Sequence, residues 1–112
     1  MADALGLGPS GIIPVEVRLL FPAFFNSNMY YVYILRSLKL GKLYVGRTND
    51  LKRRFAEHNN GKVWTTSRML PITLIFYEAF LSKNDAIRRE RYFKTSKGRV
   101  AIKLMLRNYL NK

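Results

Sequence analysis

The sequence has 112 residues, and its 20 Lys or Arg residues against 7 Asp or Glu give a formal charge of +13. That length suits one compact domain and excludes a two-domain enzyme. An apolar content of 48%, with seven Tyr and seven Phe, predicts a packed core rather than a disordered polymer. The lack of Cys excludes a disulfide-linked partner, thiolate zinc sites and Cys nucleophiles, and it is compatible with a cytoplasmic location. No run of 18 apolar residues is present, so we expect no membrane span.

The charge is unevenly distributed along the chain. Residues 1–28 contain two acidic side chains and one basic one, whereas residues 29–112 contain 19 basic and 5 acidic ones. A small domain with this excess attracts polyanions, because each neutralised phosphate releases condensed counterions. Nucleic acid is the expected partner, although ribosomal proteins and proteins on anionic membranes have the same balance.

The first 28 residues differ in composition from the rest. They hold three of the four Pro and three of the seven Gly, and no helical or strand period persists in them. Asp3 and the prolines that interrupt the apolar patches also argue against a secretory signal. We expect residues 1–28 to be irregular or disordered and residues 29–112 to form the domain.

Three strands and one short helix are predicted in the first part of this domain. Residues 30–36 and 42–46 are rich in β-branched and aromatic side chains and form an antiparallel hairpin. Asn49 or Asp50 is suited to cap a helix over residues 51–58, and a third strand follows over residues 72–77.

Two further helices are predicted after the third strand. Ser82 and Asp85 resemble a capping box that opens a helix ending near residue 95. Gly98 suggests a break, and residues 100–110 predict a last helix with Leu104 and Met105 on its apolar stripe. The order β-β-α-β-α-α predicts a domain that contains both helices and strands (α/β in the broad sense, class α+β). We expect a small three-stranded antiparallel sheet flanked by helices.

Glu90 is placed unusually for a carboxylate. It lies on the same helical stripe as Ala86, Ile87 and Phe93, so it points inward or along a seam. A partly buried carboxylate needs a cation nearby. The ordinary interpretation is a salt bridge, for instance to Arg89 or Lys94, and the alternative is a ligand for a divalent metal such as Mg²⁺.

Arg54 and His58 form a second candidate pair. They are four residues apart on the first helix and therefore adjacent. The ordinary interpretation is a solvated helix face. The alternative is a phosphodiester site, in which the guanidinium holds a phosphate and the imidazole passes a proton.

Three tyrosines complete the candidate residues. Tyr31 and Tyr33 share one face of the first strand, and Tyr44 could reach either face. Tyrosines on sheets are usually packing residues, but a phenol whose pKa falls near a metal and a basic group can accept a proton. Gly46 would let a phosphate approach the backbone closely.

Together these residues resemble the GIY-YIG nuclease family. Residues 31–33 stand at the first triplet and residues 44–46 at the second, with ten residues between Tyr33 and Tyr44. Arg54 follows Tyr44 by ten positions, where the family has its catalytic Arg, and Glu90 resembles the metal-binding Glu. The resemblance covers residues 29–112 and is closest to small standalone endonucleases related to the catalytic module of the excision-repair incision subunit.

The resemblance implies a DNA endonuclease of repair or recombination that uses one Mg²⁺ or Mn²⁺ ion held by Glu90. It implies that Arg54 stabilises the phosphoryl charge, and that Tyr33 or Tyr44 activates a water with help from the other phenol and His58. The expected nucleic-acid contacts are Arg47, Lys52, Arg53 and Lys62. The alternatives are a catalytically silent basic module that only binds nucleic acid, and a structural basic protein associated with the ribosome.

Overall fold

The computed structural model describes residues 28–111, so the prediction for residues 1–28 lies outside the described residues except at residue 28. A three-stranded sheet with the order β2-β1-β3 forms the centre of the domain, and both strand pairs are antiparallel. The strands are β1 (Tyr30–Ser37), β2 (Leu43–Thr48) and β3 (Ile72–Phe80). The predicted α+β class, the hairpin and the three strands are therefore confirmed.

Helices follow the strands in the predicted order, with two differences. They are α3 (Leu51–Asn59), α4 (Trp64–Ser67), α5 (Lys83–Phe93), α6 (Ser96–Met105) and α7 (Arg107–Leu110). Asp50 caps α3 by accepting a hydrogen bond from the backbone N–H of Arg53. The short α4 was not predicted, and the single predicted last helix is divided into α6 and α7. Within residues 28–111, no helix is long and apolar enough to span a membrane.

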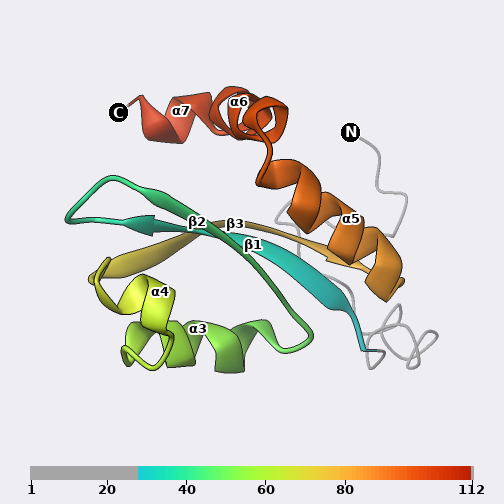
Figure 1. The fold of residues 1–112 in the computed structure, drawn as a ribbon, viewed down its shortest axis with the longest axis horizontal. Helices are drawn as coiled ribbons and strands as arrows, with labels where there is room; N and C mark the ends of the chain where they lie inside the picture. The colour runs from blue at the N-terminus through green and yellow to red at the C-terminus, as the bar shows by residue number, and fades with distance from the viewer. Residues whose placement is uncertain (1–27, 112) are drawn as a thin grey trace, which may run out of the picture.

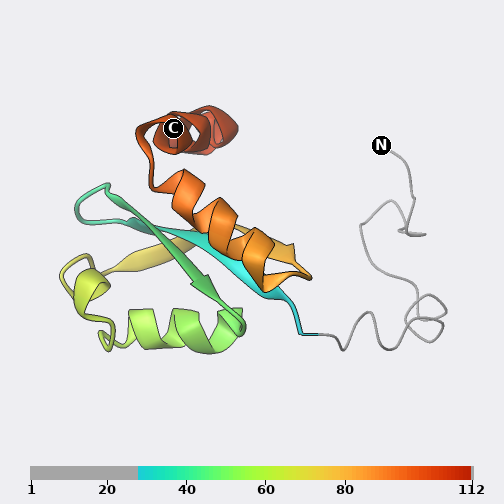
Figure 2. The ribbon, with the colours of Figure 1, turned by 45° about the vertical axis from the view of Figure 1, so that its right-hand side comes forward.

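The helices cover the two faces of the sheet separately. Val32 and Ile34 of the central strand pack under α5 and α6, whereas Tyr33 and Leu35 pack against α3 and the residues around α4. Figures 1 and 2 show α5 to α7 on one side of the sheet and α3 and α4 on the other. The central strand is thus buried on both faces, and the alternation of its side chains assigns Tyr33 to the α3 side.

Gly98 does not break the chain between helices as predicted. It lies inside α6, where its backbone N–H donates to the side chain of Thr95, the N-cap residue. A Cβ at this position would overlap with the backbone carbonyl of Tyr92 at the end of α5. Glycine therefore allows α6 to start close against α5, because a side chain would separate the two helices.

Two smaller predictions about these helices were wrong. Ser82 is the N-cap residue of α5, but its side chain makes no capping hydrogen bond, so no capping box forms. In α6, Leu104 and Met105 are exposed, while Ile102 is buried against the core. The buried face of α6 differs from the predicted one because the helix begins four residues earlier than predicted. Gly98 also holds the start of α6 close against α5, which sets the face that is turned to the core.

Candidate active site

A buried hydrogen-bond chain joins the first strand to α3 and α4. The hydroxyl of Tyr33 lies 2.7 Å from Nε2 of His58, and Nδ1 of His58 lies 2.6 Å from Oγ1 of Thr66. Tyr33 is 1% exposed, and His58 and Thr66 are fully buried. The interpretation of His58 as a solvated side chain was therefore wrong, because α4 covers it.

The donors and acceptors of this chain have one consistent assignment. The hydroxyl of Thr66 donates to the backbone carbonyl of Val63 at 3.5 Å, so its Oγ1 accepts from His58, while Arg54 acts as a donor toward the Tyr33 oxygen. The Tyr33 hydroxyl then donates to Nε2 of His58, and the Nδ1–H of the neutral imidazole donates to Thr66. Arg54 also pairs with Glu57 at 3.0 Å on its own helix. Each polar group along the chain is satisfied, which fixes the orientation of the Tyr33 phenol.

Burial has the largest effect on the pKa values of Tyr33 and His58 in this hydrogen-bond chain. Desolvation raises the pKa of Tyr33 to about 12, although the hydrogen bond from Arg54 opposes the shift. Without a metal beside it, the pKa of Tyr33 is thus raised and not lowered, because its phenolate would lose more hydration than the nearby cation returns. Desolvation, and then the charge of Arg54, lower the pKa of His58 to about 4. Both groups are therefore neutral near pH 7.

Gly46 has a structural role in this arrangement. It lies directly opposite Tyr33 in the β1–β2 register, and a Cβ on Gly46 would overlap with Cζ and Oη of Tyr33. The absence of a side chain lets the phenol lie across β2. The structure thus gives the second triplet's glycine a reason other than the phosphate approach expected from the sequence.

Tyr44 lies on the same face of the sheet as Tyr33. The centroid of its ring is 5.1 Å from that of His58 and 6.4 Å from that of Tyr33, and Tyr44 packs against the core cluster that contains Tyr33. Tyr44 is half-buried, in contrast to the enclosed Tyr33. The register of the hairpin therefore settles the face of Tyr44, which the sequence had left open.

Glu90 lies on α5 and is held by two cations. Its Oε1 accepts a hydrogen bond from Nε of Arg47 at 3.2 Å, and its Oε2 accepts one from Nζ of Lys94 at 3.0 Å. The Glu90 side chain is 19% exposed. The expected salt bridge thus forms with Lys94 but not with Arg89, which pairs instead with Glu78 on β3.

Arg54 and Glu90 belong to helices on opposite faces of the sheet, and they approach the same edge strand. Arg47, on β2, contacts Glu90 and also lines a hollow of about 280 Å³ together with Arg54. The charges of both Arg54 and Glu90 act on the Tyr33 phenol. The candidate site therefore extends around the edge formed by β2, with Arg47 between its two halves.

This hollow has the charge of a phosphate site. Four cationic side chains line it together with polar groups at the start of α3; the lining residues are Tyr30, Arg47, Thr48, Asn49, Arg53, Arg54 and Lys83. Of the other two expected nucleic-acid contacts, Lys52 lines a separate hollow beside Tyr31 and Tyr77, and Lys62 is exposed beyond the end of α3. Two of the four expected contacts, Arg47 and Arg53, are thus adjacent to Arg54.

Sequence reasoning missed Thr66 and Lys83. Thr66 lies on the four-residue α4, which has too few residues to show a helical period. Lys83 is one of many lysines, and the Ser82–Asp85 pattern around it indicated only the start of a helix. No local signal distinguishes either residue before the chain is folded.

Comparison with known proteins decides the family. A model of the GIY-YIG catalytic domain matches residues 29–103, which include every residue of the candidate site described above. The chain belongs to the GIY-YIG family. This is a nuclease family, and its three-stranded antiparallel sheet with flanking helices is the fold found here.

Small bacterial proteins of the GIY-YIG family are similar to this chain. A UPF0213 protein of Bacillus pumilus is 41% identical over 72 residues, covering 62% of this chain and 71% of the relative. A UPF0213 protein of Streptococcus agalactiae is 47% identical over 66 residues, covering 57% of this chain and 73% of the relative. No solved structure matches the chain.

The buried histidine of this GIY-YIG domain predicts an acid-sensitive fold. His58 has a folded pKa of about 4, whereas a histidine in the unfolded chain has one of about 6.5. As pH falls through this window, only the unfolded chain takes up the proton, so stability present above pH ~6.5 is lost on the way to pH ~4. We expect His58 to account for a loss of the order of 1–3 kcal/mol.

Urea unfolding at a series of pH values between 7 and 4.5 measures this loss. His58 is the only histidine of the sequence, so His58→Gln should reduce the pH dependence in this window while lowering stability overall. Carboxylates titrate in both proteins, and the comparison cancels their contribution. An identical pH slope in the two proteins would contradict the assignment of a neutral, buried His58.

Proposed function

We propose that this protein is a divalent-metal-dependent DNA endonuclease that hydrolyses a phosphodiester bond at the edge formed by β2. The observation that carries the proposal is the arrangement around that edge. The chain of Arg54, Tyr33 and His58 lies on one side, and Glu90 lies on the other, joined through Arg47. As part of the same proposal, we place the activity in the cytoplasm, in repair or recombination.

The chemistry of Glu90 fits a single hard cation such as Mg²⁺ or Mn²⁺. Mg²⁺ is commonly held by one or two carboxylates together with waters and substrate phosphates. Among residues 28–111, no group of three or more His, Asp or Glu side chains is placed to hold a metal, so Glu90 would be a single protein ligand. A metal bound there would supply Lewis-acid stabilisation of the reacting phosphate.

The cationic residues of the hollow bind and orient the substrate. The guanidinium of Arg54 is presented by its pairing with Glu57 and is suited to contact two phosphoryl oxygens at once. Arg47 is suited to exchange its contact with Glu90 for one with the phosphate, because the phosphoryl oxygens gain negative charge as the phosphodiester is attacked. These fixed positive charges stabilise the charge that develops as the phosphodiester is attacked.

A proton relay through Tyr33 fits the hydrogen-bond chain. As the Tyr33 oxygen takes a proton from the attacking water, its own hydroxyl proton passes to Nε2 of His58, 2.7 Å away, and it returns along the same path to the departing oxygen, because the lowered pKa of His58 does not retain it. No phenolate needs to exist beforehand, which is consistent with the raised pKa of Tyr33. Tyr44, half-buried beside His58, would position the water or the substrate.

Conservative variants distinguish the roles of Tyr33 and Tyr44. Tyr33→Phe removes the relay and should lower kcat about 10²- to 10⁴-fold, with little change in DNA affinity. Tyr44→Phe should have the smaller effect on kcat. Single-turnover cleavage at saturating protein, compared with binding in EDTA, measures both quantities. A larger loss of kcat in Tyr44→Phe would exclude Tyr33 as the relay.

The main rival is a binding module that has kept the fold without turnover. It is favoured by the high positive charge of the domain and by the cations that already occupy both oxygens of Glu90. Incubation with supercoiled plasmid, branched DNA and single-stranded DNA, with Mg²⁺, Mn²⁺ or EDTA, distinguishes the two. Nicks that require metal support the endonuclease, whereas binding in EDTA without product under any metal supports the silent module.

A further inference from the structure

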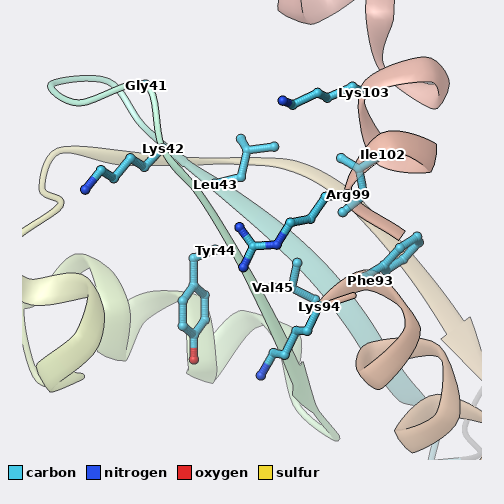
Figure 3. A pocket seen from close by; sticks show the side chains of 10 residues that line it. All are labelled: Gly41, Lys42, Leu43, Tyr44, Val45, Phe93, Lys94, Arg99, Ile102 and Lys103. Atoms are coloured by element: carbon cyan, nitrogen blue, oxygen red, sulfur yellow. The ribbon is translucent and has the colours of Figure 1, made fainter. Parts of the chain in front are cut away.

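A second hollow, larger than the one beside Arg54, adjoins the candidate active site. It has a volume of about 620 Å³ and lies between the β1–β2 hairpin, strand β2 and the junction of α5 with α6. Figure 3 shows the side chains that line it: Gly41, Lys42, Leu43, Tyr44, Val45, Phe93, Lys94, Arg99, Ile102 and Lys103. We call this hollow the basic groove.

The basic groove combines an apolar floor with a cationic rim. Val45, Phe93 and Ile102 are buried core residues at its base. The rim carries Lys42, Lys94, Arg99 and Lys103, and none of the described residues that line the groove is acidic.

The rim cations are poorly compensated within the fold. Only Lys94 takes part in an ion pair among the described residues, and its partner is Glu90. Like charges gathered around one hollow repel one another, so this arrangement opposes folding slightly rather than stabilising it. A polyanionic ligand would remove that repulsion.

Two residues make the basic groove continuous with the candidate site. Tyr44 lines the groove, and its ring is also 5.1 Å from that of His58. Lys94 lines the groove and also binds Glu90. In Figure 3, Arg99 extends from α6 toward Tyr44, and Lys103 extends over the groove from the next turn of the helix. The cations therefore extend from the site along β2 toward the hairpin.

We propose that the basic groove holds the sugar-phosphate backbone of one substrate strand on one side of the bond to be cut. The proposal rests on the proposed nuclease function for the identity of the strand. Arg99 and Lys103 contact successive phosphates, Lys42 contacts the backbone from the hairpin side, and the apolar floor accommodates sugar. In this proposal α6 and the end of α5 act in substrate binding, while α5 also presents Glu90.

Salt dependence of binding tests the groove without requiring cleavage. The probes are a fluorescein-labelled duplex and its separated single strand, titrated in EDTA at several salt concentrations. The double variant Arg99→Gln/Lys103→Gln should weaken binding at low salt. It should also reduce the magnitude of the slope of log binding constant against log salt concentration by about 1.8 on duplex or about 1.4 on single strand. Lys42→Gln, from the opposite wall, should lower the slope by about half as much.

Arg88→Gln is the matched control for loss of one positive charge. Arg88 lies on α5 beside Phe80 and Asp85, in a different hollow. Its substitution should therefore leave the salt slope nearly unchanged. A lowered slope on either probe supports the groove and shows which form it holds. Unchanged slopes on both probes, or an equal effect of Arg88→Gln per charge, overturn it.

The groove and the nuclease function fail separately in these experiments. If the groove variants lose affinity but no metal ever supports cleavage by the unaltered protein, the groove stands and the nuclease function falls. If cleavage is metal-dependent and the groove variants keep full affinity and salt slope, the nuclease function stands and the groove falls.

Discussion

Glu90→Gln is expected to abolish metal-dependent nicking of supercoiled plasmid while leaving DNA binding intact or tighter. The amide keeps the size of the side chain but removes the charge that would hold the metal, which should cost about 10³-fold in rate. The same change releases Arg47 and Lys94, the two cations that now bind the carboxylate, so both become available to phosphates. Cleavage rates in Mg²⁺ and affinities in EDTA measure the two effects.

Glu78→Gln is the control for this change. Glu78 is also a half-buried carboxylate paired with an arginine, but it lies on β3 and pairs with Arg89. It should retain nicking activity and show at most a modest loss of stability. Nicking at the unaltered rate by purified, folded Glu90→Gln would refute the role of Glu90.

Arg54→Ala is expected to lower the cleavage rate at saturating DNA by about 10²- to 10³-fold. The substitution removes the guanidinium beside the phosphate hollow and also the donor that holds the Tyr33 hydroxyl in place. Arg54→Lys should restore little of the rate, because an ammonium cannot make the two parallel contacts of the guanidinium. Single-turnover rates with plasmid DNA measure the loss.

Arg88→Ala is a suitable comparison for Arg54→Ala. Arg88 also pairs with a carboxylate three residues away on its helix, but it is exposed on α5 and lies away from the phosphate hollow. It should keep the cleavage rate within about twofold, since exposed ion pairs of this kind contribute little. A similar loss in both variants would show that Arg54 acts only through net charge.

Local patterns in the sequence predicted the sheet and the main helices well. The aromatic and β-branched runs located the strands, and Asp50, one of the two predicted candidates, caps α3. Predictions that depended on a contact between distant elements were less successful. Gly98 suggested a break, because nothing nearby in the sequence shows that Tyr92 packs against its backbone.

The spacing of residues in the sequence identified the candidate residues. It did not predict the environment of each side chain in the fold. The direction of the Tyr33 pKa depends on burial under α3 and α4, and α4 has no sequence period by which to recognise it. His58 was judged solvated for the same reason. Helical spacing did identify Lys94 as a partner of Glu90, since the two are four residues apart, but Arg47 reaches Glu90 only through the tertiary fold. The catalytic roles of these residues stay predictions.

The close packing of Gly98 on Tyr92 means that one residue sets the angle at which α6 leaves α5. Arg99 and Lys103 follow directly on that helix, so their reach toward the hairpin depends on a position that itself touches no ligand. A bulkier residue there would displace α6 from the end of α5, and with it these two cations on the rim of the basic groove. The spacing of the cations that we propose to hold substrate is therefore adjustable from a position remote from the proposed reaction, without altering a single charged group.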